Sequence, residues 1–220
     1  MRMRPDLRLY AILDPAHCAG PLEDLARRAA EGGATLFQLR DKESPTRVLV
    51  ARARALREAL APFGRPFLVN DRVDVALAAG AAGVHVGQED LSPEDARRLL
   101  GPDAVIGLTV RSVEEAEAAP VELLDYVGVG GIFATVSKAN PNPPIGLGGL
   151  TRIAGVLRGR APGLAICAVA GITAENAAAV IRAGADGVAV ISALSKAPDP
   201  AVAARRLCAA VDGVLGSTNR

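Results

Sequence analysis

The feature that most constrains this chain is a repeated alternation of short apolar runs with helical patterns. Eight apolar runs predict strands, and segments with helical periodicity separate them. The expected strands cover residues 8–13, 35–39, 66–69, 83–86, 104–108, 125–129, 164–169 and 187–191. The expected helices cover residues 21–31, 45–60, 73–79, 93–100, 112–119, 149–158, 174–183 and 199–214.

Capping residues support these boundaries. Ser92, Ser112 and Thr173 stand where helices are expected to begin, and their side chains can accept from free backbone N–H groups. Gly80 and Gly184 follow expected helices, as a C-terminal glycine commonly does. The pattern therefore predicts complete βα units.

Eight βα units in one chain predict an α/β fold. The strands are too apolar to face water, so we expect a parallel sheet covered by helices. Eight units also close a single-domain (β/α)8 TIM barrel, which we expect to span residues 1–220. The alternative is an open doubly wound sheet, but no Gly-x-Gly-x-x-Gly motif follows the first strand.

Composition excludes several classes of function. The net charge is +1, from 25 basic against 24 acidic residues, and aromatic residues make up 3%. This argues against a nucleic-acid partner or a membrane surface. No apolar stretch approaches the roughly 18 residues that span a bilayer, and the N-terminus lacks the apolar run of a signal peptide. Three cysteines without paired spacing fit a cytoplasmic protein, in which we expect Cys167 to be buried and inert.

Polar residues follow most of the expected strands. Gln38, Arg40 and Lys42 alternate at the end of the second strand, so extended backbone would direct all three to one side. Arg40, Lys42 and Lys138 suit a diphosphate, because arginine offers a planar fork and lysine a compact charge. The alternative for each cation alone is a solvated surface residue.

Asp71 and Asp90 end neighbouring strands and are candidate ligands for Mg²⁺. This cation takes oxygen ligands and is commonly held by one or two carboxylates together with substrate phosphate. Zinc would call for histidine or cysteine partners, which the pattern does not supply. The alternative for Asp71 is an N-cap of the helix expected to begin at Val73.

The last two strands lead into candidate phosphate ligands. Gly171 and the pair Ile191-Ser192 precede expected helices, whose free N–H groups favour a monophosphate. The alternative is a simple structural turn. His85 is expected to be a packed, hydrogen-bonded residue, and His17 has no identifiable partner, so neither is included in the site.

The ordered set of motifs resembles the thiamine phosphate synthase family. The motifs are residues 38–42 (QLRDK), 69–71 (VND), 85–91 (HVGQEDL), 125–138 and 184–193, and the resemblance runs from about residue 8 to 210. It implies a (β/α)8 transferase that joins hydroxymethylpyrimidine diphosphate to thiazole phosphate and releases pyrophosphate. Magnesium is the implied cofactor.

The resemblance also implies roles for individual residues. Asp71 and Asp90 would hold magnesium. Lys138, Arg40 and Thr109 would be catalytic, and the 131–148 connection would be a mobile lid that brings Lys138 over the phosphates. The pyrimidine diphosphate would contact Gln38, Leu39, Arg40, Asp41, Lys42, Asn70, Thr109 and Lys138, with the side chains of Asp41 and Glu43 facing elsewhere. The thiazole phosphate would contact Thr135, Val136, Ser137, Gly171, Ile191 and Ser192.

The chain departs from the family pattern at four places. Thr109 replaces a serine, Gly131 a proline and Ser137 a threonine, while Ala170 stands in a turn that is usually richer in glycine. The rival functions are a thiazole tautomerase-type isomerase, a non-catalytic phosphate-ligand binder, and a sugar-phosphate epimerase or aldolase. The intact carboxylate pair favours the synthase. Barrels of this size often associate, so a homo-oligomer is a further expectation, although no interface signature is present.

Overall fold

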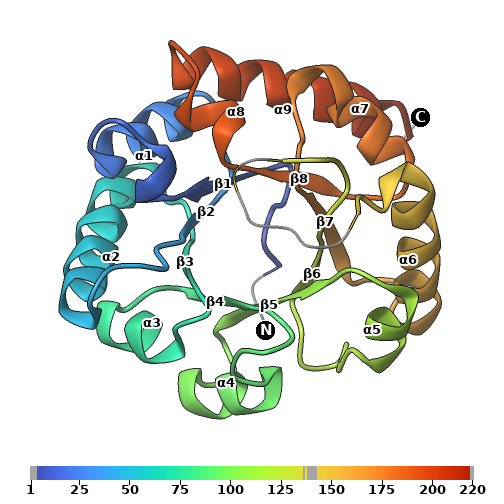
Figure 1. Ribbon diagram of the computed structural model, residues 1–220, viewed down its shortest axis with the longest axis horizontal. Coiled ribbons are helices and arrows are strands. Elements are labelled where there is room, and N and C mark those ends of the chain that lie inside the picture. The colour runs from blue at the N-terminus through green and yellow to red at the C-terminus, as the bar shows by residue number, and fades with distance from the viewer. Residues whose placement is uncertain (1–3, 136, 138–142, 219–220) are drawn as a thin grey trace.

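The computed structural model of the protein describes residues 4–135, 137 and 143–218, and it contains a closed barrel of parallel strands (Figure 1). Each strand pairs with the next along the chain, and β8 pairs with β1. This confirms the predicted (β/α)8 fold. The strands are β1 (Leu9–Leu13), β2 (Leu36–Leu39), β3 (Phe67–Asn70), β4 (Gly83–Val86), β5 (Val105–Val110), β6 (Tyr126–Val129), β7 (Ala165–Val169) and β8 (Gly187–Val190).

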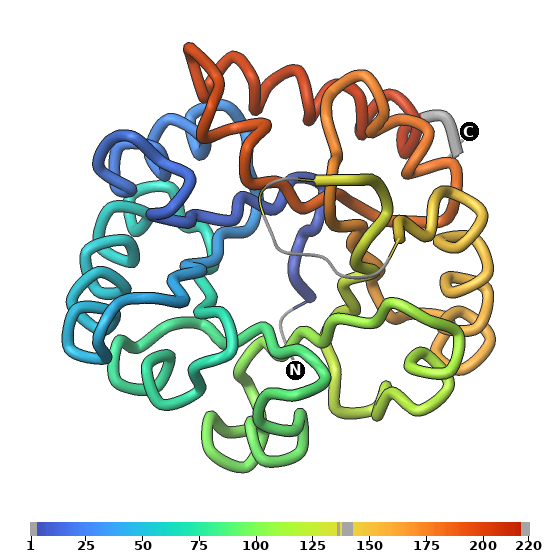
Figure 2. The backbone as a smooth tube through the Cα atoms, in the orientation of Figure 1, coloured from blue at the N-terminus to red at the C-terminus, as the bar shows by residue number. Residues whose placement is uncertain are grey.

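The helices form an outer ring around this barrel, and α9 packs against both α1 and α7 where the ring closes (Figures 1 and 2). Sequence analysis did not predict the one-turn helix α8. The helices are α1 (Leu22–Glu31), α2 (Thr46–Leu60), α3 (Val73–Ala79), α4 (Pro93–Leu100), α5 (Val113–Ala118), α6 (Gly146–Arg160), α7 (Ala174–Arg182), α8 (Ser192–Ser195) and α9 (Pro200–Thr218), with 3₁₀ turns η1 (Pro15–His17) and η2 (Ala61–Phe63). None of the described helices is long and apolar enough to cross a membrane.

Apolar side chains fill two separate layers. Alternate strand residues point outward and pack against the helices, and the others point into the barrel. The interior cluster contains Leu36, Leu68 and Val105, and Leu7 packs into it from the segment before β1. Burying each such side chain contributes roughly 1.5–3 kcal/mol. The interior is thus a packed core on which the functional end of the barrel rests.

Helix starts agree with the predicted caps. Ser92 and Ser112 accept from the backbone N–H three residues on, at 3.1 and 3.2 Å, and Thr173 forms a capping box with Asn176. The position before α3 differs from the alternative considered for Asp71. The N-cap there is Arg72, with no side-chain capping bond, so Asp71 does not cap this helix.

The connection between β6 and α6 is shorter than expected, because α6 begins at Gly146 and not at residue 149. Its two described ends are fixed by the backbone. Ile132 and Phe133 donate to the carbonyls of Val169 and Ala170, both at 3.2 Å, and Ile145 donates to Gly131 at 2.9 Å. The lid between these anchors stays a prediction, and residues 136 and 138–142 lie outside the described part of the chain.

Candidate active site

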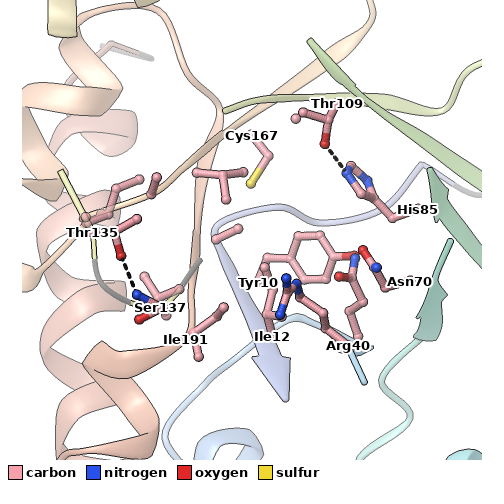
Figure 3. A pocket seen from close by; sticks show the side chains of 18 of the residues that line it. Tyr10, Ile12, Arg40, Asn70, His85, Thr109, Thr135, Ser137, Cys167 and Ile191 are labelled. Atoms are coloured by element: carbon pink, nitrogen blue, oxygen red, sulfur yellow. Dashed lines mark hydrogen bonds between the residues drawn. The ribbon is translucent and has the colours of Figure 1, made fainter. Parts of the chain in front are cut away.

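A cavity opens at the carboxyl ends of the strands, and all eight strands contribute to its lining (Figure 3). In barrels of this type, chemistry is concentrated at this face. Most of the predicted site residues meet there. Those that line the cavity are Gln38, Arg40, Asn70, Thr109, Thr135, Ser137, Gly171, Ile191 and Ser192.

A chain of hydrogen bonds crosses the inner end of this cavity. Gln38 Nε2 donates to the Tyr10 hydroxyl, which lies 3.0 Å from the Tyr126 hydroxyl. Tyr126 Oη lies 2.8 Å from His85 Nδ1, and His85 Nε2 lies 2.7 Å from Thr109 Oγ1. Figure 3 shows the last of these bonds. Burial raises the pKa of both tyrosines, so the two hydroxyls remain protonated.

Arg40 is held at the cavity wall by Asp14. The two side chains form an ion pair in which Asp14 is 3% and Arg40 17% exposed. Asp14 also accepts from the backbone N–H of Ala16 at 2.9 Å, so its carboxylate is fixed by the turn that follows β1. Such a buried pair fixes the position of the guanidinium at the cavity wall. Sequence analysis missed Asp14, although its place directly after the first strand could have marked it.

Lys42, Asp71 and Asp90 gather beside the cavity. The Lys42 ammonium forms an ion pair with Asp71, whose side chain is 16% exposed. Burial, together with the nearby Asp90 carboxylate, raises the pKa of Asp71, while Lys42 opposes this effect. The alternate positions of Gln38, Arg40 and Lys42 had predicted that all three would line one cavity. Lys42 does not line the main cavity. It lines a neighbouring hollow with Asp14 and His17.

The Asp71–Asp90 pair fits Mg²⁺. Two carboxylates close enough to interact repel each other, and a divalent cation between them relieves that repulsion. Mg²⁺ is commonly held by one or two carboxylates together with waters and substrate phosphate. Asp71 also has a positive φ of 60°, and its N–H donates to the His85 carbonyl at 2.8 Å. Strained backbone of this kind is common at functional sites.

Another part of the cavity lining is neutral and rich in hydroxyl groups. Ser137 is 4% exposed, and its Oγ has no hydrogen-bond partner among the described residues. Its N–H donates to Thr135 Oγ1 at 3.2 Å, and its carbonyl lies 2.8 Å from His17 Nε2. His17 thus has a partner that sequence analysis did not identify. A buried, unpaired hydroxyl beside Gly171 is available to a bound ligand.

Backbone conformation brings Gly171 close to the 131–148 connection. Its φ is 67°, and a Cβ there would come within 2.6 Å of the Ala134 carbonyl oxygen. Ala170 also has a positive φ, of 90°, although it is not a glycine. The turn keeps its glycine-like geometry despite the departure at Ala170, at a strain cost of about 1–2 kcal/mol.

Among the described residues, Leu39 and Asp41, like Lys42, Asp71 and Asp90, do not line the main cavity. Leu39 is fully buried in the layer between sheet and helices. The Asp41 carboxylate pairs with Arg52 and accepts from the N–H groups of Glu43 and Ser44, so its side chain faces α2, as predicted. Its contact with the pyrimidine diphosphate stays a prediction. Val136 and Lys138 lie outside the described residues.

The structure adds residues that sequence analysis left out of the site. Tyr10, Tyr126, His85 and Cys167 all line the cavity from inward-facing strand positions. His85 is packed and hydrogen-bonded as predicted. Cys167 is fully buried, and burial raises the pKa of its thiol, which agrees with an inert side chain. Alternation along the strands could have identified these residues, because it directs their side chains into the barrel.

Together, these features define an enzyme-like (β/α)8 barrel with convergent polar groups at the carboxyl ends of its strands. The sequence profile of the family described as thiamine monophosphate synthase matches residues 9–194. The chain belongs to this family.

Curated relatives and a solved structure agree with that assignment. The chain is 47% identical over 211 residues to a thiamine-phosphate synthase of Agrobacterium fabrum, covering 96% of both chains. It is 48% identical to the thiamine-phosphate synthase of Moorella thermoacetica, covering 92% of this chain and 95% of the relative. It superimposes on the thiamine phosphate pyrophosphorylase from Pyrococcus furiosus with a TM-score of 0.84 and 38% identity, covering 97% of this chain and 99% of the other.

Proposed function

We propose that this protein is a transferase that condenses hydroxymethylpyrimidine diphosphate with thiazole phosphate to give thiamine phosphate and pyrophosphate. The observation that supports this most directly is the division of the site. Arg40, Lys42 and the Asp71–Asp90 pair form a charged part, and Ser192 and the glycine turn at the ends of β7 and β8 form an uncharged part. Ser137 lines both the cavity and the hollow that holds Lys42. The charged part suits a metal-assisted diphosphate, and the uncharged part suits a monophosphate.

The proposed reaction needs no covalent nucleophile from the protein. The C–O bond between the pyrimidine methylene and the diphosphate breaks, and its electron pair leaves with pyrophosphate. The lone pair of the thiazole nitrogen then forms the new C–N bond. Because that nitrogen carries no proton, no general base is needed. The electron-rich pyrimidine can stabilise the positive charge at the methylene.

The residues of the chain would therefore act by charge and position. Arg40, held by Asp14, and Lys42 would neutralise the leaving diphosphate, and Asn70 would donate to it. Asp71 and Asp90 would hold Mg²⁺, which when bound supplies further positive charge to the departing oxygens. Lys138 is proposed to join them. Fixing the two reactants in line can supply several kcal/mol, with about 7–11 kcal/mol as the upper range.

The thiazole phosphate is proposed to bind at the β7–β8 end. Ser137, Ser192 and the backbone of Gly171 line that end, and Ser137 Oγ is free to donate. The connection between residues 131 and 148 is proposed to cover both substrates and to exclude water that would capture the cation. Ile132 donates to Val169 of β7, and Ile145 donates to Gly131, so such a movement would lie between these anchors.

We extend this proposal to a reducing cytoplasm, because Cys18, Cys167 and Cys208 are all free thiols. Association into a homo-oligomer remains a prediction that sedimentation can measure.

Asp71→Asn provides the principal test of the metal site. Asparagine tolerates a positive φ, so the backbone can stay as it is. The amide removes one of the two carboxylate charges that would hold the metal. We expect the parent protein to form thiamine phosphate and pyrophosphate in equal amounts with Mg²⁺, and a chelator to stop it. The variant should lose at least about 100-fold in kcat/KM, on the order of 3 kcal/mol.

Asp74→Asn is the matched control, because Asp74 lies three residues away and pairs with Arg72 at the surface. It should keep the parent's kinetics. If Asp71→Asn turns over at the parent's rate, the metal assignment is wrong. If the parent forms neither product under conditions in which a known synthase does, the proposed transferase activity is wrong.

A further inference from the structure

The orientation of the Gln38 amide sets the direction of the hydrogen-bond chain from Gln38 to Thr109. Gln38 Nε2 donates to Tyr10, so the Tyr10 proton is directed to the Tyr126 oxygen, 3.0 Å away. The Tyr126 proton is then directed to His85 Nδ1 at 2.8 Å. His85 consequently carries its proton on Nε2 and donates to Thr109 Oγ1 at 2.7 Å. Each member both accepts and donates, so the orientation at one end determines the orientation at the other.

The barrel is shaped to hold this chain. Tyr126 lies opposite Gly107 in the β5–β6 register, and a Cβ on Gly107 would come within 2.1 Å of the Tyr126 ring. A Cβ on Gly128 would come within 3.1 Å of the His85 ring. The His85 and Tyr126 rings stack at 5.4 Å, and the Tyr10 and Tyr126 rings meet edge to face at 5.9 Å. The ring positions are therefore set by close packing as well as by hydrogen bonds.

The two ends of the chain present opposite groups to the cavity. Because Gln38 uses its amide nitrogen on Tyr10, its Oε1 is left as an acceptor. Because Thr109 Oγ1 accepts from His85, its own proton is left to be donated. Gln38 lies on β2 and Thr109 on β5, so the two groups face the cavity from well-separated strands around the barrel.

We propose that Tyr10, Tyr126 and His85 are positioning residues that set this donor and acceptor pattern and thereby select an aminopyrimidine. The inference rests on the proposed function, because the pyrimidine diphosphate is the substrate of that reaction. A 4-aminopyrimidine carries an exocyclic N–H donor and ring nitrogens that accept. Its amine matches the Gln38 acceptor, and a ring nitrogen matches the Thr109 donor.

The same pattern rejects the pyrimidine in which oxygen replaces the amine. Its carbonyl would face the Gln38 Oε1, which is also an acceptor, and the ring N–H of the oxo form would leave one fewer nitrogen acceptor. The amide could turn over to donate only if Tyr10 released its nitrogen. Discrimination therefore depends on residues that lie behind Gln38 and that need not touch the ligand.

Tyr126→Phe tests this inference at a distance from Gln38. The ring remains packed against Gly107, but the chain is cut, so Tyr10 can redirect its proton and the Gln38 amide can turn over. Calorimetry with Mg²⁺ and without thiazole phosphate gives the Kd of the amino and oxo pyrimidine diphosphates. We expect the parent to bind the amino compound much more tightly than the oxo compound. In the variant, this preference, measured as the ratio of the two Kd values, should fall about tenfold. The KM for thiazole phosphate should stay within about twofold.

Val105→Ala is the matched control, because Val105 is buried in the same interior without a polar atom in the chain. It should leave the amino-to-oxo ratio unchanged. Tyr10→Phe releases Gln38 directly and should also lower the preference for the amino over the oxo compound. It provides a second measurement should Tyr126→Phe not fold.

The inference is overturned if Tyr126→Phe weakens both compounds by the same factor, or if the parent does not distinguish them. These outcomes are separate from failure of the proposed function. A parent that binds the amino compound selectively but forms no thiamine phosphate would contradict the transferase activity and leave the positioning roles supported.

Discussion

Asp71 combines a strained backbone, a buried carboxylate and a neighbouring carboxylate. Its φ of 60° is unusual for a residue other than glycine, and its side chain is 16% exposed. Burial and Asp90 raise its pKa even though Lys42 forms an ion pair with it. These properties each cost stability in the free protein. They are compensated if a cation binds, which is the arrangement expected of a metal ligand.

The pKa of Asp71 leads to a prediction about stability and pH. The folded protein holds this proton to a higher pH than the unfolded chain, whose aspartate has a pKa of about 3.9. Between the ordinary and the raised pKa, the folded state binds more protons, so the free energy of unfolding falls as pH rises. Ionised Asp71 therefore costs stability at neutral pH when no cation is bound.

We accordingly expect Asp71→Asn to be more stable than the parent at pH 7 in a chelator. The advantage should shrink as pH falls through the raised pKa, because the parent carboxyl is then neutral too. Lys42 loses its partner in the variant, but it is 48% exposed, so this loss is small. Urea unfolding at pH 7 and pH 4 measures the difference. A variant less stable than the parent at pH 7 would contradict the prediction.

At the scale of elements, the same arrangement of an aspartate and an arginine occurs at the starts of two strands, β6 and β8. Asp125 precedes β6 and accepts from the N–H of Ile106 at 2.8 Å, while Arg97 of α4 pairs with it. Asp186 precedes β8 and accepts from Ile166 at 2.7 Å, while Arg158 of α6 pairs with it. Each aspartate thus joins a strand, its neighbour and a helix at the end opposite the cavity. Bonds at this end of the barrel contribute to stability and not to chemistry.

The two aspartates allow a comparison at different burial. Asp125→Ala leaves the buried Arg97 charge with carbonyl partners but no carboxylate, since the two side chains are 4% and 12% exposed, and it should cost about 3–5 kcal/mol. Asp186→Ala should cost clearly less, because Asp186 is 39% and Arg158 36% exposed. Urea unfolding measures both. The kcat of either folded variant should match that of the parent, and a selective loss of activity would contradict a purely structural role.

At the scale of the whole molecule, the closed barrel places its apolar core at one end and the candidate site at the other. The interior is apolar at its base, where Leu7, Leu36 and Val105 meet, and polar where the strands end. All eight strands reach the cavity, so each site residue that lies on a strand has a paired strand on both sides. Such preorganised groups lose little entropy when a transition state forms.

This arrangement predicts that ligands of the diphosphate side stabilise the entire fold. Pyrophosphate with Mg²⁺ at about 100 times its Kd should add about 2.7 kcal/mol. For a chain of this length that raises Tm by roughly 5–10 °C. Differential scanning fluorimetry measures the shift, with Mg²⁺ alone and pyrophosphate plus chelator as controls. An equal shift without Mg²⁺ would show that the cations bind the anion unaided.

Local patterns in the sequence determined the eight strands, most helix boundaries, the family, and the candidates Gln38, Arg40, Asn70 and Thr109. These depend on short-range periodicity, on capping and on the order of motifs, all of which the chain carries in neighbouring residues. Only the tertiary structure decided that Tyr10 meets Tyr126, 116 residues away, and that Asp14 holds Arg40. It also turned Asp41 toward Arg52 and Lys42 toward Asp71. The reason is physical: strand register and barrel closure decide which distant side chains meet, and beyond the end of a strand, alternation no longer directs a side chain.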